Sequence, residues 1–154
     1  MRLDYNETWP AAQRAMMALE KAVHGSGLDW RVAELVKIRA SQLNGCAYCL
    51  DMHLKDARAL GEDQARLDLV AAWRDSECFT ERERAALEWC ESLTLLADTG
   101  APDEPYDAVA AVFNAEEQVA LTLAIVAING WNRLNVGFRT PPGDYVSRHL
   151  SPSG

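Results

Sequence analysis

Two cysteines and a histidine occur at helical spacing in the segment Cys46-Ala-Tyr-Cys49-Leu-Asp-Met-His53. Each residue of an α-helix turns by about 100°, so the three side chains would lie within roughly 60° of one another. Two thiols can cycle between dithiol and disulfide while an imidazole beside them transfers protons. The same three groups could instead bind a metal ion. The spacing therefore indicates either thiol redox chemistry or a metal site.

The residues around the pair predict where it lies in a helix. Asn44-Gly45 breaks one helix, and Cys46 opens the next, so both cysteines fall in a first turn. There the helix dipole and unpaired N–H groups stabilise a thiolate, and the two-residue spacer permits an intramolecular disulfide. The alternative is that both are small buried apolar residues. His53 follows Cys49 by one turn and could accept its proton, which favours the reactive interpretation.

Glu34 and Tyr48 are weaker candidates. Glu34 lies twelve residues before Cys46, on a preceding helix that could pack against the cysteines. From these residues alone, the favoured interpretation of Glu34 is a solvated carboxylate paired with Arg31 or Lys37. Tyr48 could donate a hydrogen bond between the cysteines or simply pack.

The remaining cysteines are interpreted as structural. Cys90 falls on the apolar stripe of a predicted helix, and Cys78 lies near a loop, where it would be an adventitious thiol.

The hydrophobic pattern predicts an all-α protein of about six or seven helices. Apolar residues recur at steps of three and four, and no alternation with period two is long enough for a strand. The segment Val119–Ile128 is apolar nearly all round and should be buried in the core or a subunit interface. Asp98–Pro105 is predicted to be a loop, and the tail from Thr140 to be irregular. With their flanking capping residues, the predicted helices span 9–23, 29–44, 46–61, 63–73, 80–96, 106–113 and 114–135.

Length, composition and charge are those of a globular protein. The 154 residues fit one domain (1–154), with 49% hydrophobic and 25% charged residues. The net charge of −8 and the lack of a Lys/Arg run argue against binding to nucleic acid or to an anionic membrane. Residues 1–10 lack signal-peptide features, and the longest apolar stretch is too short to cross a bilayer. We therefore expect a cytoplasmic protein without a structural disulfide framework.

The segment from Glu34 to His53 resembles a known family. Its sequence, Glu34-Leu-Val-Lys-Ile-Arg-Ala-Ser-Gln-Leu-Asn-Gly-Cys46-Ala-Tyr-Cys49 followed by His53, is similar to the alkyl hydroperoxidase D-like (AhpD-like) family of the carboxymuconolactone decarboxylase-like superfamily. That family's signature is a glutamate, a CxxC twelve residues later, then three residues and a histidine. Ile128–Asn135 is similar to the last core helix of small single-domain members. The resemblance covers about residues 9–139.

The resemblance implies an all-α fold that commonly assembles as trimers or hexamers. It implies a thiol-dependent peroxidase, in which Cys49 is the peroxidatic thiol, Cys46 the resolving thiol, and His53 with Glu34 the proton relay. The substrate would be a hydroperoxide and the reductant an external dithiol, with no cofactor and no metal. Some members carry a second histidine where this chain has Tyr48, which cannot act as a base near neutral pH. The decarboxylase branch lacks the cysteine pair, so the lactone reaction is not expected here.

Three alternatives stay open. A dithiol–disulfide oxidoreductase or redox sensor of the same fold would use the same four residues and hardly touch peroxide. A metal site could use Cys46, Cys49 and His53, with Glu34 as a fourth ligand, although zinc sites usually draw on two separated pairs. A non-catalytic helical interaction module would rest on the apolar last helix alone.

Overall fold

The computed structural model describes residues 1–149, and all regular secondary structure within this range is helical. The part of the predicted irregular tail beyond residue 149 lies outside the described residues, and residues 140–149 contain no helix. The all-α prediction is confirmed, but six or seven helices is wrong, because residues 1–149 form nine α-helices and one 3₁₀ helix. The elements are α1 Tyr5–Thr8, α2 Pro10–His24, α3 Trp30–Leu43, α4 Ala47–Ala59, α5 Gln64–Leu69, η1 Val70–Asp75, α6 Glu81–Thr94, α7 Leu96–Thr99, α8 Asp103–Val112 and α9 Ala115–Phe138.

The two α-helices that the sequence did not predict, α1 and α7, are single turns of four residues. Helix α1 has four residues and begins where the Asp4 carboxylate accepts hydrogen bonds from two backbone N–H groups. Helix α7 ends at Gly100, whose φ of 66° suits glycine, and it occupies part of the predicted Asp98–Pro105 loop. Helix α8 begins at Asp103 and not at the predicted Tyr106, because Pro105 is tolerated in a first helical turn. Of the predicted loop, residues 100–102 are not helical.

Helices α3, α6 and α9 begin at the residues predicted to cap them. The Asp29 carboxylate accepts from the N–H of Arg31 at the start of α3. Reciprocal side-chain and backbone hydrogen bonds form capping boxes at Thr80 before α6 and at Asn114 before α9. The predicted helix over 63–73 instead divides at Val70 into α5 and η1.

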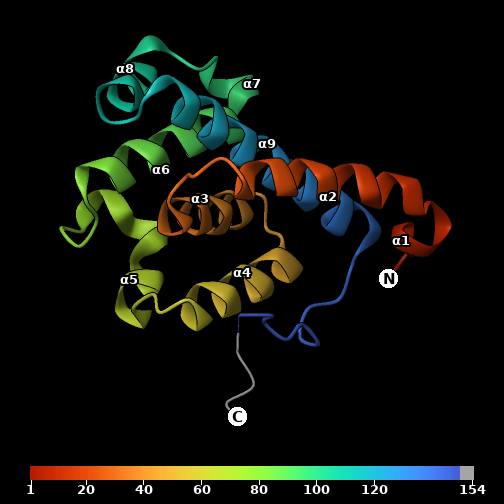
Figure 1. Cartoon of the computed structure of the whole chain (residues 1–154). Coiled ribbons are helices and arrows are strands. Elements are labelled where there is room, and N and C mark those ends of the chain that lie inside the picture. The colour runs from red at the N-terminus through yellow and green to blue at the C-terminus, as the bar shows by residue number, and fades with distance from the viewer. Residues whose placement is uncertain (150–154) are drawn as a thin grey trace.

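Helix α3 is the centre of the molecule (Figure 1). It packs against α4, α6 and α9, and every residue from 32 to 38 is buried. Glu34 and Lys37 lie within this buried run, so their charges need partners inside the protein. The core around α3 contains two clusters of apolar side chains, one of which includes Cys46 and Cys49.

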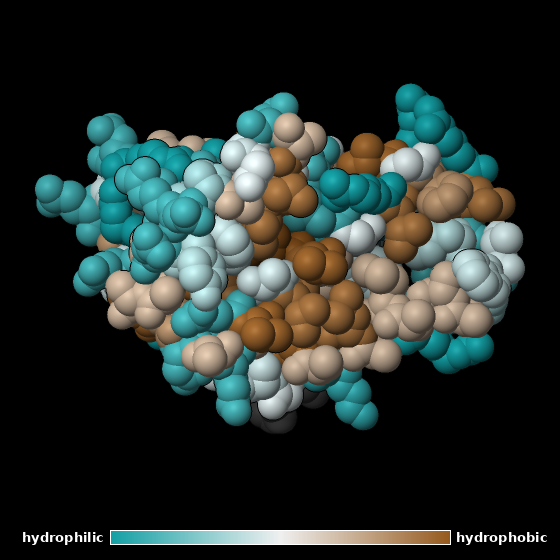
Figure 2. Space-filling model, turned by 90° about the horizontal axis from the view of Figure 1, so that it is seen from above, coloured by the Kyte–Doolittle hydropathy of each residue, from teal (hydrophilic) through white to brown (hydrophobic). Residues whose placement is uncertain are grey.

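Helix α9 is buried on most of its circumference but not on all of it. Within the predicted apolar segment, Leu121, Ile125 and Ile128 are buried, whereas Val119 and Val126 are 61% and 51% exposed. Figure 2, which views the molecule from above, shows hydrophobic side chains gathered near the middle of the face that it presents. No helix within residues 1–149 is long and apolar enough to cross a membrane.

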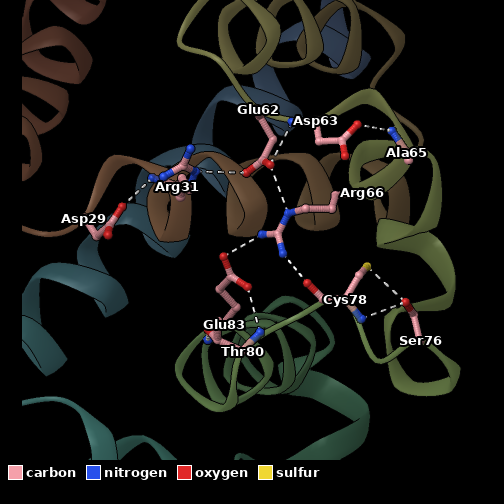
Figure 3. A network of polar contacts seen from close by, with 10 residues as sticks. All are labelled: Asp29, Arg31, Glu62, Asp63, Ala65, Arg66, Ser76, Cys78, Thr80 and Glu83. Carbon is pink, nitrogen blue, oxygen red and sulfur yellow. Dashed lines mark hydrogen bonds and ion pairs between the residues drawn. The ribbon is translucent and has the colours of Figure 1, made fainter.

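A partly buried ion-pair network connects the end of α4 to α5 and α6 (Figure 3). The Arg66 guanidinium lies 2.9 Å from Oε1 of Glu62 and 2.6 Å from Oε1 of Glu83. Both carboxylates are buried, and the same arginine donates to the backbone carbonyl of Cys78. Arg66 therefore joins the end of α4, the start of α6 and the loop that contains Cys78.

Candidate redox site

The two cysteines lie at the N-terminus of α4, as the sequence predicted. Gly45 adopts a φ of 64°, which turns the chain sharply after α3. Cys46 is the N-cap residue, and its sulfur accepts a hydrogen bond from the N–H of Cys49 at 3.3 Å. The structure joins Cys46 and Cys49 in a disulfide, and both residues are at least 99% buried. The pair thus occupies a site where backbone N–H groups stabilise negative charge on sulfur.

Glu34 and His53 face each other next to this pair. Nδ1 of His53 lies 2.9 Å from Oε2 of Glu34, and both side chains are buried. The interpretation of Glu34 as a solvated carboxylate is wrong, because α3 is buried along its whole central part. Lys37 lies 3.8 Å from Glu34, as its spacing suggested, but Arg31 pairs with Glu62 at 3.6 Å instead.

The hydrogen bond between these side chains fixes what each ring nitrogen can do. Burial opposes ionisation of Glu34, but the charge and hydrogen bond of His53 and the charge of Lys37 together hold its pKa below the usual value. An ionised carboxylate can only accept, so Nδ1 of His53 carries the proton in this pair. Nε2 of His53 is buried and has no hydrogen-bond partner among residues 1–149. In the neutral ring, Nε2 is the nitrogen that is able to accept a proton.

Lys37 connects Glu34 to another charged residue, Glu20. Its ammonium group, which is buried, lies 3.0 Å from Oε2 of Glu20 on α2. The indole N–H of Trp131 on α9 donates to the other oxygen of Glu20 at 3.1 Å. Sequence reasoning had considered Lys37 only as one possible ion-pair partner of a solvated Glu34, and it did not single out Glu20. No local pattern indicates this burial, because Glu20 becomes a neighbour of Lys37 only when the helices assemble.

Asn135 and Tyr5 also belong to the site, and sequence reasoning missed both. The Asn135 amide nitrogen lies 3.5 Å from the Cys49 sulfur, and its oxygen accepts from the Tyr5 hydroxyl at 3.0 Å. Asn135 is buried at the end of α9, where Asn129, Asn132 and Asn135 follow an apolar run at three-residue spacing. That row of amides on a buried helix was a usable signal.

Tyr48 and the other two cysteines take different positions. Tyr48 is partly buried and packs against the apolar cluster that holds the disulfide, and it lies near enough to Tyr5 to raise that phenol's pKa together with burial. Cys78 is exposed and Cys90 is buried in the core. Burial raises the pKa of Cys90 to about 12, which makes this thiol inert near neutral pH.

The residues that the sequence offered as metal ligands contact one another or Glu34 in the structure. Cys46 and Cys49 are joined to each other, and His53 is held by Glu34. Among residues 1–149, no group of three or more histidine, cysteine, aspartate or glutamate side chains is placed to hold a metal ion.

The chain belongs to the carboxymuconolactone decarboxylase family, whose sequence profile matches residues 10–92. Uncharacterized protein YdfG of Bacillus subtilis (strain 168) is 41% identical over 135 residues, which are 88% of this chain and 92% of that protein.

Solved structures show the same fold. ATU0492 of Agrobacterium tumefaciens, described as a protein of unknown function and a candidate antioxidant defence protein AhpD, superposes with a TM-score of 0.90 and is 46% identical. The alignment covers 94% of this chain and 99% of that one. The debrominase Bmp8 superposes with a TM-score of 0.76 at 18% identity, over 88% of this chain and 73% of its own. At that identity the likeness concerns the fold alone. The site described above therefore lies in an AhpD-like fold with a CxxC disulfide.

Proposed function

We propose that this protein is a thiol-dependent peroxidase that reduces hydroperoxides through Cys49 and Cys46. The observation that carries the proposal is the arrangement of His53 beside a buried CxxC pair. One ring nitrogen is held by Glu34 at 2.9 Å, and the other is buried without a partner among residues 1–149. A histidine oriented in this way is suited to take a proton from a thiol one helical turn away.

The first step forms a sulfenic acid on Cys49. His53 takes the thiol proton through Nε2, and Glu34 stabilises the resulting imidazolium. The Cys49 thiolate attacks the terminal oxygen of ROOH, the O–O bond breaks, and the alkoxide takes the proton from His53 to leave as ROH. Sulfur supplies the two electrons that reduce the peroxide.

The second step closes the disulfide. The Cys46 sulfur attacks the sulfenic sulfur, and the hydroxyl leaves as water after taking the Cys46 proton. Cα atoms of the two residues lie 5.4 Å apart, which suits such a bond. An external dithiol then reduces the disulfide by thiol exchange and is itself oxidised, so the net reaction converts ROOH and a dithiol to ROH, water and a disulfide.

The second candidate is a dithiol–disulfide oxidoreductase or redox sensor that uses the same residues. Tyr48 favours it, because a phenol in this position provides no second base for peroxide reduction. The debrominase activity of Bmp8 suggests no third candidate, since that likeness concerns the fold alone.

A thiol titration separates the two candidates. The reduced Cys78→Ser variant, which lacks the exposed thiol, is mixed with one equivalent of cumene hydroperoxide in a stopped-flow instrument. The peroxidase proposal expects rapid loss of two thiols and a Cys46–Cys49 bond in the peptide mass spectrum. Cys49→Ser should lose this reaction, and His53→Ala should slow it by about 100-fold or more. Oxidation no faster than that of a free thiol, together with fast exchange with a small disulfide, would favour the second candidate.

We further propose that the protein is a homo-oligomer. Several helices carry exposed hydrophobic side chains, among them Met17 of α2, Leu96 of α7 and Val126 of α9. Figure 2 shows hydrophobic side chains gathered on one face of the molecule. An exposed apolar face of this kind is typical of a subunit interface. Light scattering after size exclusion tests this, with a trimer or hexamer as the expected result and a monomer as the contradicting one.

A further inference from the structure

The Cys49 sulfur has a hydrogen-bond donor that comes from outside the Glu34–His53 segment. The Asn135 amide nitrogen approaches it to 3.5 Å from the end of α9, and both residues are at least 95% buried. Sulfur accepts at longer distances than oxygen, so this separation is a contact between donor and acceptor. The reactive sulfur is therefore held between α4, on which it lies, and the last helix.

Tyr5 determines which end of the Asn135 amide faces the sulfur. Its hydroxyl donates to Oδ1 of Asn135 at 3.0 Å, which leaves the amide NH₂ group for Cys49. The Tyr5 ring is itself held by Phe138, with ring centroids 5.7 Å apart. Burial and the neighbouring Tyr48 raise the pKa of Tyr5, so its hydroxyl remains a donor at neutral pH. Helix α1 thus supports the amide from the side opposite the sulfur.

We propose that Asn135 is a further catalytic residue, whose amide donates a hydrogen bond to the Cys49 thiolate, and that Tyr5 positions this amide. The inference rests on the proposed function in taking Cys49 as the reacting thiol. A hydrogen bond to an anion is stronger than one to a neutral sulfur. The amide therefore stabilises the thiolate more than the thiol or the disulfide, which is the differential stabilisation that catalysis requires.

The other groups around Cys49 act on it in ways that differ from the hydrogen bond of Asn135. His53 acts from the next turn of α4, and Glu34 reaches the site through His53, which pairs its charge. Burial and the neighbouring Tyr48 raise the pKa of Tyr5, so the Tyr5 phenol is neutral at physiological pH. The Asn135 amide does not titrate, so it donates to Cys49 at every pH. Its effect is therefore to lower the pKa of Cys49.

The test is a pH titration of Cys49 without any hydroperoxide. The full-length Cys46→Ser/Cys78→Ser protein retains Cys49 and the buried Cys90, whose pKa of about 12 keeps it out of the titration range. Thiolate absorbance in the ultraviolet and the rate of alkylation by iodoacetamide each report the Cys49 pKa. In this background, Asn135→Ala should raise the Cys49 pKa by about one unit, which lowers the thiolate fraction about tenfold below the pKa. Tyr5→Phe should raise it in the same direction by less.

Asn132→Ala is the matched control. Asn132 is a buried amide on the same helix, but it donates to the Ser41 hydroxyl at 3.0 Å and not to sulfur. Its loss should leave the Cys49 pKa unchanged. The inference is overturned if Asn135→Ala leaves that pKa unchanged in a protein with native circular dichroism, or if Asn132→Ala raises it equally.

Two features keep this test decisive and separate from the peroxidase assay. Should Asn135→Ala not fold, Tyr5→Phe, which deletes a single hydroxyl, decides the inference by the same titration. A Cys49 pKa that depends on Asn135 in a protein inert to cumene hydroperoxide would support the inference and overturn the proposed function. Fast reaction with the hydroperoxide and a Cys49 pKa independent of Asn135 would support the proposed function and overturn the inference.

Discussion

Nδ1 of His53 and Oε2 of Glu34 lie 2.9 Å apart, although nineteen residues separate them along the chain. The contact crosses from α4 to α3 and is buried on both sides. It depends on the turn at Gly45, which returns the chain against α3. One hydrogen bond therefore orients the imidazole and also contributes to the packing of two central helices.

Replacing Glu34 by glutamine should remove the contribution of this carboxylate to the pH dependence of the free energy of unfolding. The folded-state pKa of Glu34 is lowered, because the effects of His53 and Lys37 outweigh burial. A carboxylate of this kind stabilises the fold above its unfolded pKa of about 4.3, and the contribution is lost as pH falls through the folded value. Glu34→Gln should cost about 2 kcal/mol at neutral pH, and this difference should shrink in acid.

Urea unfolding of the wild type and Glu34→Gln across the acid range measures that difference. Glu77→Gln, at an exposed loop position, serves as the control and should change the unfolding free energy by less than about 0.5 kcal/mol. A Glu34→Gln deficit of equal size in neutral and acid solution would contradict the assignment.

Arg66→Ala should be among the most destabilising substitutions of a charged residue. It leaves two buried carboxylates, Glu62 and Glu83, without their shared partner (Figure 3). Both carboxylates are buried but the arginine is partly exposed, so the loss should be about 2 kcal/mol. Arg58→Ala removes an exposed arginine from the end of α4 and should cost less than about 0.5 kcal/mol. Denaturant unfolding of both variants checks this, and similar small losses would show that the network contributes little.

Tyr145→Phe should weaken the attachment of the C-terminal tail to α4. The Tyr145 hydroxyl contacts both carboxylate oxygens of Asp56, at 2.9 and 3.0 Å. Burial and this carboxylate raise the pKa of Tyr145 from 10.0 to about 12. The phenol therefore stabilises the fold below its unfolded pKa, and this contribution disappears as pH rises through about 12.

The expected loss for Tyr145→Phe is about 1 kcal/mol at neutral pH. Because the variant lacks the titrating phenol, its unfolding free energy should fall less steeply than that of the wild type in the alkaline range. Val146→Ala changes the neighbouring side chain, which is 72% exposed, and should leave stability and its alkaline slope unaltered. Identical slopes for wild type and Tyr145→Phe would refute the role of Asp56.

The four cysteines should fall into three classes of reactivity. In the oxidised native protein, Ellman's reagent should titrate the exposed Cys78 at once, whereas Cys90 should react only after unfolding. Reduction should then make the Cys46–Cys49 pair available as well. Cys78→Ser should abolish the immediate reaction, and a remaining fast thiol in that oxidised variant would mean that Cys90 is accessible.

The sequence was sufficient to predict features that depend on neighbouring residues. Caps at Asp29, Thr80 and Asn114 and the placement of Cys46 at a helix start all follow from local hydrogen-bonding chemistry. Helix spacing alone had placed Glu34 in solvent, and it was the family resemblance that brought this residue into the site.

Contacts between distant segments could not be predicted in this way. Tyr5 meets Asn135 across 130 residues, so no local pattern contains the pair. The one-turn helices α1 and α7 are too short to show a hydrophobic period. The burial of Lys37 depends on Glu20 of α2, which becomes its neighbour only when the helices assemble.

Cys46 and Cys49 share one turn at the start of a helix, with Cα atoms 5.4 Å apart. In the proposed cycle the second thiol is therefore already beside the first when a sulfenic acid forms, and no segment has to unfold to bring it there. Overoxidation to sulfinic acid requires a second peroxide molecule to arrive before that neighbour reacts. A peroxidase built in this way should keep working through a large excess of peroxide, and its lifetime under oxidative stress would be limited by the supply of reductant.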